Sequence, residues 1–187
     1  METAPGPILV GIEEYLAAEQ HSPVRHEYIG GNVYAMAGAS DRHNLISGNI
    51  YAMLHSHLRG KACRVFMADV KLRMQVRGEN VFCYPDLMAV CDSRDTDRFF
   101  KRFPKVLVEV LSEATERTDR GEKFLSYTQI DTLEEYALVG QDRMEITLFR
   151  RANRWKAELT SRPEEVLRLQ SLEFTMPLAA VYEALEW

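Results

Sequence analysis

Two acidic residues near the middle of the chain stand in segments that otherwise have the composition of buried strands. Glu109 is the one charged residue in the apolar run Val106–Leu111. Asp86 follows Tyr84–Pro85 and comes directly before the apolar run Leu87–Cys91. A carboxylate in a low-dielectric setting is costly unless a cation or hydrogen bonds compensate it. Neighbouring strands could bring both carboxylates to one point, where oxygen ligands suit Mg²⁺ or Mn²⁺.

The backbone carbonyl of Val110 would be the third ligand of such an ion. A bound divalent ion can polarise a phosphodiester and lower the pKa of water, so the pair favours metal-dependent phosphodiester hydrolysis. Each acid taken alone has a simpler interpretation. Glu109 could form a buried ion pair with an arginine or lysine, and Asp86 could accept hydrogen bonds from nearby backbone amides in a turn.

Three further residues are candidates for the same site. Lys123 lies about one turn into a predicted helix, where its ammonium could stabilise transition-state charge or position the attacking water. A solvent-facing lysine paired with Asp119, four residues earlier, fits the spacing equally well. Glu27 could be a third acid, and His43 could act as a base or bind phosphate. For both Glu27 and His43, a surface or capping role fits the sequence at least as well.

Other polar residues rank lower. Lys71 and Asp69 are weaker candidates for the site. His55 and His57 are two residues apart on a predicted helix, so their side chains diverge and cannot chelate one ion. We interpret both histidines as structural.

The elements that must position these residues follow from hydrophobic periodicity and turn signals. Helices are expected over Ile8–Glu19, from Ser40 or Asp41 to about Leu58, from about Thr118 to Thr128, and over Pro177–Leu185. Strands are expected over Arg25–Ile29, Asn32–Ala37, Cys63–Phe66, Val70–Val76, Val81–Tyr84, Leu87–Cys91, Val106–Leu111, Glu135–Val139, Arg143–Arg150, Trp155–Thr160 and Val166–Leu169. The first two strands form a hairpin, because Gly30-Gly31 supplies the positive φ of a tight turn.

Two of these strands are apolar on both faces, Val106–Leu111 and Glu135–Val139, which is typical of central strands covered on both sides. Arg143–Arg150 is expected to be an edge strand. The inward stripe of the long helix is expected to contain Leu45, Ile46, Asn49, Ile50, Met53, Leu54 and His57. The predicted fold class is α/β (α+β), with one mixed central β-sheet flanked by helices.

The bulk properties predict one soluble domain over residues 1–187, with a flexible N-terminus at residues 1–7. The net charge of −5 argues against a protein that coats nucleic acid by charge alone, although a metal site itself needs acids. No apolar run approaches the roughly 20 residues of a membrane helix. Met1–Pro7 has no features of a secretory signal, so a cytoplasmic location is expected.

The three cysteines, Cys63, Cys83 and Cys91, are odd in number and form no C-x-x-C pair. Two of them lie in apolar, strand-like runs. We therefore expect buried reduced thiols rather than disulfides or a zinc site.

A series of short motifs, spread from about Ile8 to the C-terminus, resembles one known family in content and order. The motifs are Glu13-Glu14-Tyr15-Leu16, Arg25-His26-Glu27-Tyr28-Ile29-Gly30-Gly31, Met36-Ala37-Gly38-Ala39-Ser40, Arg42-His43-Asn44, Pro85-Asp86, Val108-Glu109-Val110-Leu111-Ser112, Thr115, Asp119, Lys123, Tyr127 and Glu134-Glu135-Tyr136. Together they resemble the Uma-two family of restriction-type endonucleases, which is assigned to the PD-(D/E)XK nuclease superfamily.

The resemblance implies a restriction-endonuclease-like fold and a metal-dependent phosphodiesterase site with Asp86 and Glu109 as metal ligands. Leu111 stands where the superfamily has the lysine of its E-x-K motif. The resemblance suggests that Lys123, on the following helix, takes over the role of that lysine.

The expected activity is that of an endonuclease that uses Mg²⁺ or Mn²⁺ to hydrolyse DNA. A homodimer is an accompanying hypothesis, because duplex DNA has two strands, and Arg143–Arg150 is one strand that could pair across a two-fold axis. A second hypothesis is a non-catalytic binding or regulatory module in which an internal ion pair holds Glu109. A third is a hydrolase of smaller phosphate esters, because a fold alone does not fix the substrate.

Overall fold

The computed structural model describes residues 9–113 and 115–186. The expected flexible segment 1–7 lies outside the described residues. The helical elements are α1 (Ile12–Glu19), α2 (Asp41–Leu58), α3 (Glu116–Thr118), the π-helical turn η1 (Asp119–Lys123), α4 (Phe124–Tyr127), the 3-10 turns η2 (Arg151–Asn153) and η3 (Gln170–Leu172), and α5 (Leu178–Val181). The strands are β1 (His26–Ile29), β2 (Asn32–Ala35), β3 (Arg64–Met67), β4 (Lys71–Val76), β5 (Glu79–Cys83), β6 (Leu87–Val90), β7 (Phe100–Lys101), β8 (Pro104–Leu111), β9 (Glu135–Gly140), β10 (Ile146–Arg150), β11 (Ala157–Thr160), β12 (Val166–Leu169) and β13 (Phe174–Pro177).

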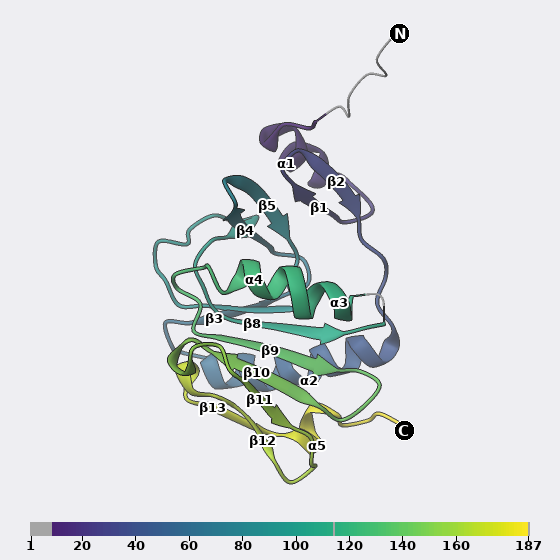
Figure 1. Ribbon diagram of the computed structural model, residues 1–187, viewed down its shortest axis with the longest axis vertical. Coiled ribbons are helices and arrows are strands. Elements are labelled where there is room, and N and C mark those ends of the chain that lie inside the picture. Colours follow the sequence, from purple (N-terminus) through teal and green to yellow (C-terminus); the bar gives the residue numbers. More distant parts are fainter. Residues whose placement is uncertain (1–8, 114, 187) are drawn as a thin grey trace.

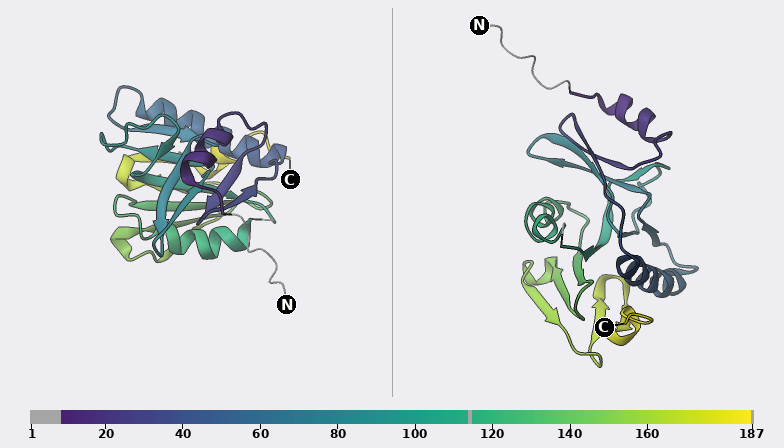
Figure 2. Two further views of the ribbon diagram at one scale, coloured as in Figure 1. Left: turned by 90° about the horizontal axis from the view of Figure 1, so that it is seen from above. Right: turned by 90° about the vertical axis from the view of Figure 1, so that its right-hand side faces the viewer.

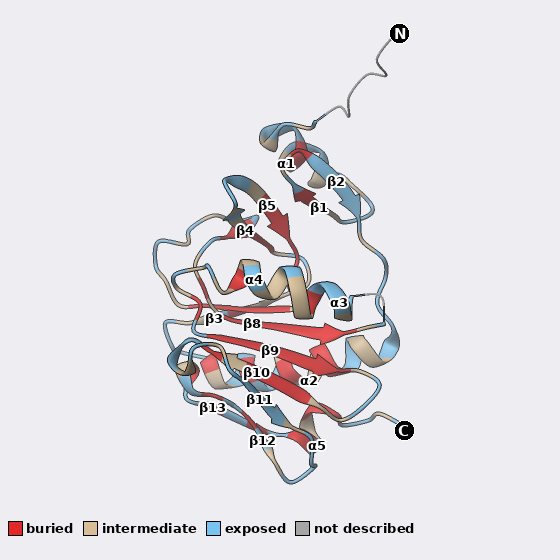
Figure 3. Cartoon of the chain, viewed as in Figure 1, coloured by how far each residue is buried: buried red, intermediate tan, exposed pale blue. Residues whose placement is uncertain are grey.

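The predicted mixed central sheet is confirmed as a six-stranded sheet in the order β11-β10-β9-β8-β6-β3 (Figure 1). Strands β8 and β9 are parallel, and the other pairs are antiparallel. Helix α2 covers one face of this sheet, and the continuous helical run α3–η1–α4 covers the other (Figure 2). The two faces are buried, as the apolar sequences of β8 and β9 predict (Figure 3).

A second sheet, in the order β2-β1-β5-β4-β7, differs from the expectation of a single sheet. The chain passes between the two sheets five times, and two of these crossings adjoin each other. It crosses from β3 to β4 through Ala68, whose φ is +46°, and from β5 to β6 through Pro85, which cannot donate to a ladder. The amide of Ala68 donates to the carbonyl of Asp86 at 3.1 Å, so the two crossings lie side by side.

The N-terminal elements follow the sequence closely. The hairpin β1–β2 turns at Gly30 and Gly31, which have φ of +54° and +97°. Helix α2 begins after Ser40, whose hydroxyl accepts from the amide of His43 at 3.1 Å. Among the described residues, no helix is both long and apolar enough to cross a membrane.

Three predictions about the sheets and helices are wrong. Strand β10 is not an edge strand, because β9 and β11 pair with its two sides, so Arg143–Arg150 cannot pair with a second copy. The C-terminal segment contains β13 before a shorter helix α5. In α2, Leu45 and Met53 are 40% and 45% exposed, because the helix packs through a narrow stripe of residues four apart: Ile46, Ile50, Leu54 and Leu58.

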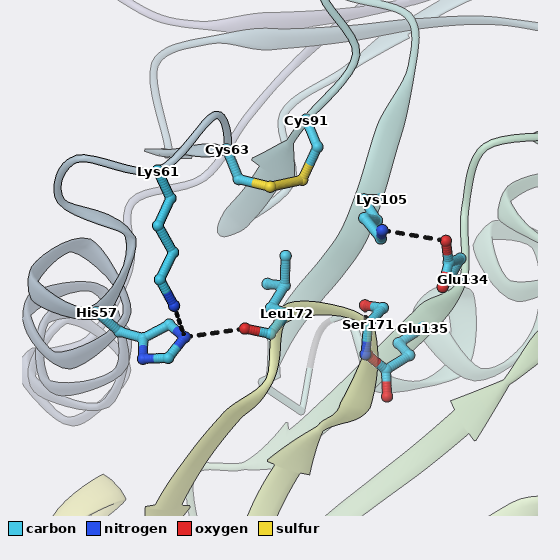
Figure 4. Close-up of a disulfide and its surroundings, with 9 residues drawn as sticks. All are labelled: His57, Lys61, Cys63, Cys91, Lys105, Glu134, Glu135, Ser171 and Leu172. Atoms are coloured by element: carbon cyan, nitrogen blue, oxygen red, sulfur yellow. Dashed lines mark hydrogen bonds and ion pairs between the residues drawn. A yellow bond between two sulfur atoms is a disulfide. The ribbon is translucent and has the colours of Figure 1, made fainter.

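The cysteine prediction is wrong for two of the three residues. Cys63 and Cys91 form a disulfide, whereas Cys83 is a free and buried thiol (Figure 4). The antiparallel register of β3 and β6 explains the pairing, because it sets Arg64 opposite Val90. Cys63, just before Arg64, therefore lies opposite Cys91, just after Val90. The sequence alone does not show this, because it does not give the strand register.

We expect the double variant Cys63→Ser/Cys91→Ser to be less stable to urea than the wild type by about 3.5 kcal/mol, because the disulfide closes a loop with a sequence separation of 28. A reductant should destabilise the wild type by a similar amount and leave the double variant unchanged. Equal stability of the wild type with and without reductant would contradict a disulfide in solution.

Candidate active site

Asp86 and Glu109 meet where the chain enters the central sheet from the second sheet. Leu87 pairs with Val108, so Asp86 lies just beyond the end of β6 and beside Glu109 on β8. The amide of Asp86 donates to Glu109 Oε2 at 3.2 Å, and Asp86 Oδ2 accepts from the amide of Val110 at 2.7 Å. These reciprocal hydrogen bonds fix the two carboxylates relative to each other.

Glu109 lies on the face of β8 that is covered by α4. Alternate residues Leu107 and Leu111 pack on this face with Tyr127. Glu109 is 3% exposed, and its Oε1 accepts from the Tyr127 hydroxyl at 2.9 Å. Burial raises the pKa of Glu109 well above its usual range, and the nearby Lys123 only partly opposes that effect. A cation at this carboxylate would therefore relieve a large desolvation cost.

Lys123 reaches this carboxylate from the π-helical turn η1. Its Nζ lies 3.2 Å from Glu109 Oε1 and 3.0 Å from Asp119 Oδ1. The pairing with Asp119 that the spacing allowed is therefore present, but Lys123 does not face solvent, since its side chain is 18% exposed. Burial alone would lower the pKa of Lys123, but the two carboxylates raise it well above its usual value. Leu111, in the position of the E-x-K lysine, is buried at 5% exposure.

His43 lies in the first turn of α2, next to Asp86, which is the more solvent-exposed of the two acids. Its Nε2 is 2.9 Å from Asp86 Oδ1, and the two side chains are 16% and 20% exposed. His43 thus contacts the carboxylate that is nearer to solvent, while Lys123 contacts the carboxylate that is buried. The two basic groups approach the pair from different helices.

Glu27 lies near the site but contacts neither acid. Tyr28 pairs with Phe82, which places Glu27 opposite Cys83, and Cys83 Sγ is 3.5 Å from the Tyr127 hydroxyl. The negative charge of Glu27 is one of the groups that raise the pKa of Cys83 to about 12, after burial, which is the largest cause. Within the described ranges, Glu27 forms no hydrogen bond or ion pair with Asp86 or Glu109.

The donor set suits a hard divalent cation. Two carboxylates from adjacent strands and a backbone carbonyl are oxygen ligands, and Mg²⁺ commonly binds one or two carboxylates and completes its shell with water. The amide of Val110 donates to Asp86, so the backbone of Val110 lies beside the acids. Over residues 9–113 and 115–186, however, no cluster of three or more His, Cys, Asp or Glu side chains is arranged to hold a metal. The residues therefore fit a cation held by two side chains rather than an all-protein cage.

Asp119 and Tyr127 belong to the site but were not among the predicted site residues. Asp119 is 2% exposed, and its Oδ1 accepts no hydrogen bond from the residues that the structure describes, although Lys123 Nζ lies beside it. A signal was present in the sequence, because Asp119, Lys123 and Tyr127 are spaced by four and so share one helical face. The spacing does not show that this helical face packs against β8, the strand that carries Glu109.

Comparisons with known proteins identify a family and two relatives of this chain. Residues 12–179 match the Uma2 family, described as "Putative restriction endonuclease". An uncharacterised protein of Synechocystis sp. is 35% identical over 92% of this chain and 91% of its own length. A second uncharacterised Synechocystis sp. protein is 29% identical over 68% of this chain and 73% of its own length.

A solved structure shows the same fold at low sequence identity. The crystal structure of "a putative nuclease belonging to DUF820" from Anabaena variabilis aligns with a TM-score of 0.74 and 16% identity, covering 94% of this chain and 98% of that chain. The restriction-endonuclease-like fold expected from the motifs is thereby confirmed. With a family match that spans nearly all of the described residues, this chain belongs to the Uma2 family.

Proposed function

We propose that the chain is an endonuclease that hydrolyses DNA phosphodiester bonds with Mg²⁺ or Mn²⁺ bound by Asp86, Glu109 and the carbonyl of Val110. The observation that carries the proposal is the reciprocal pair of hydrogen bonds that holds the two carboxylates together at the junction of two sheets. The family description supports nuclease activity. Metal, substrate and residue roles are our inferences from the geometry.

Each side chain has a distinct role in this proposal. The divalent ion, when bound, supplies Lewis-acid activation of the phosphodiester and of water. Lys123 places a positive charge beside Glu109 and would stabilise the negative charge that develops on the phosphoryl oxygens. His43 holds Asp86 Oδ1 and lies on its solvent-accessible side, where it can bind phosphate or accept a proton. Glu27 would act at longer range, as a charge that limits how closely DNA approaches the site.

A non-catalytic binding or regulatory module is the second candidate, and one observation favours it. The ammonium of Lys123 lies beside both Glu109 and Asp119, so the chain itself supplies a cation to these carboxylates. That internal ion pair could be the whole reason why a carboxylate is retained in a buried strand.

We expect the purified wild type to cleave plasmid DNA with Mn²⁺ or Mg²⁺ and to be inactive in EDTA. Calorimetric titration with Mn²⁺ near neutral pH should show one binding event, because the side chains of Asp86 and Glu109 lie side by side on adjacent strands. The non-catalytic module predicts neither heat of Mn²⁺ binding nor cleavage. Mn²⁺ binding without cleavage of DNA would redirect the search to smaller phosphate esters.

A further inference from the structure

A polar cavity of about 730 Å³ adjoins the crossing that carries Asp86. Its lining includes Glu19, Arg25, Asp69, Lys71, Tyr84 and Phe99. We propose that this cavity binds a phosphate of the DNA strand one or two nucleotides from the scissile bond, and that Lys71 is the residue that binds it. The proposal rests on the proposed function, because it takes the substrate to be DNA. It adds a subsite that is separate from the acids and from Lys123.

Lys71 differs from the other buried lysine and arginine side chains. It is 5% exposed, yet in the part of the chain that the structure describes, no carboxylate lies within ion-pair distance of its ammonium. Lys101 donates to two backbone carbonyls, and Arg150 pairs with Glu135. Lys71 Nζ instead lies over the ring of Tyr84, 5.3 Å from its centroid. An unpaired ammonium at the wall of a cavity can bind an anion.

Burial lowers the pKa of Lys71, while the more distant charges of Glu19 and Asp97 oppose that shift. Among the described residues, no hydrogen bond or ion pair to the Lys71 ammonium offsets the cost of its burial. A phosphate in the cavity would remove that cost, because charge-assisted hydrogen bonds to phosphate are among the stronger polar contacts in proteins.

The acids in the cavity are already occupied by other partners. Glu19 accepts from the amide of His26 at 2.8 Å and from the Tyr84 hydroxyl at 2.7 Å, and its second oxygen lies 3.0 Å from His26 Nδ1. Asp69 forms an ion pair with Arg25. Within the part of the chain that the structure describes, Lys71 is therefore the charged group of the lining without a counter-charge at contact distance, so the cavity favours an anion over a cation.

The cavity lies close enough to Asp86 to hold a phosphate next to the scissile one. Tyr84 lies two residues before Asp86, so their backbones are at most roughly 7 Å apart. Asp69 follows Ala68, whose amide donates to the carbonyl of Asp86. Phe99 is 51% exposed, and its carbonyl accepts from the amide of Lys71 at 3.3 Å. An exposed aromatic ring next to a phosphate site can contact a base or sugar of the same nucleotide.

The test is metal-free binding of a short fluorescein-labelled DNA duplex, followed by anisotropy in EDTA over a range of salt concentrations. We expect Lys71→Met to weaken binding and to reduce the slope of log affinity against log salt by about 1, because one phosphate contact is lost. Lys71→Arg should restore most of the slope. The matched control is Lys156→Met, an exposed lysine before β11, which should bind like the wild type.

The outcomes separate the subsite from the proposed function. If the wild type cleaves DNA with Mn²⁺ but Lys71→Met has the same salt slope as Lys156→Met, the subsite is wrong and the nuclease proposal stands. If no protein cleaves DNA but only Lys71→Met loses slope and Lys71→Arg regains it, the subsite stands and the catalytic proposal fails. A folded wild type that neither binds nor cleaves DNA overturns both. Thermal melting of each variant identifies any loss of binding that is due to unfolding.

Discussion

In the Glu109→Gln and Asp86→Asn variants, we expect Mn²⁺-dependent DNA cleavage to fall by at least about 100-fold. Loss of an outer-shell partner of a metal typically costs 10–100-fold in affinity or activity, and a lost ligand should cost at least as much. Both substitutions keep the size of the side chain and remove only its charge. Rates measured at saturating DNA and several Mn²⁺ concentrations would show whether the loss is in metal affinity or in turnover.

The matched control for this prediction is Glu135→Gln. Glu135 is 2% exposed on β9 and pairs with Arg150 at 3.0 Å, so it is a buried strand carboxylate with a basic partner, as Glu109 is. It lies at the opposite end of the parallel pair, opposite Val106. Glu135→Gln should destabilise the fold and leave the Mn²⁺ dependence of cleavage unchanged. An equal loss of cleavage in all three variants, at equal folded fraction, would mean that Asp86 and Glu109 have no special role.

The central features of the fold could be predicted because they depend on local composition. The apolar sequences of β8 and β9 require cover on both faces, and the structure supplies α2 on one side and α3–α4 on the other. Ser40 and the Gly30-Gly31 turn are local signals that hold regardless of what packs around them. The isolated charge of Glu109 within an apolar strand likewise identifies a site without knowledge of its neighbours.

The remaining features depend on register between segments that are distant in sequence. The disulfide follows from the pairing of Arg64 with Val90, and β10 is internal because β11 pairs with it. The separation of the five-stranded sheet from the central sheet depends on where Pro85 lies in space relative to Ala68. The contact of Lys123 with Glu109 spans fourteen residues and two elements, so helical spacing alone could show only its contact with Asp119.

The second large effect is expected in Lys123→Met. This substitution leaves Glu109 and Asp119, which are 3% and 2% exposed, as buried carboxylates that face each other without a cation. Breaking a buried ion pair by removing one partner costs about 3–5 kcal/mol, so urea unfolding should show a loss of about 3 kcal/mol or more. Lys105→Met is the control, because Lys105 pairs at 3.3 Å with the half-exposed Glu134 and should cost less than about 1 kcal/mol.

The response of Lys123→Met to metal distinguishes an active site from a structural ion pair. If Asp86 and Glu109 bind a divalent ion, Mn²⁺ should restore part of the lost stability, because it replaces the missing positive charge and binds the folded state alone. Cleavage should nevertheless stay low, since the ammonium that we propose to stabilise the phosphoryl oxygens is absent. A Lys123→Met protein that is destabilised but gains no stability from Mn²⁺ would favour the non-catalytic module, in which Lys123 is the only cation that Glu109 binds.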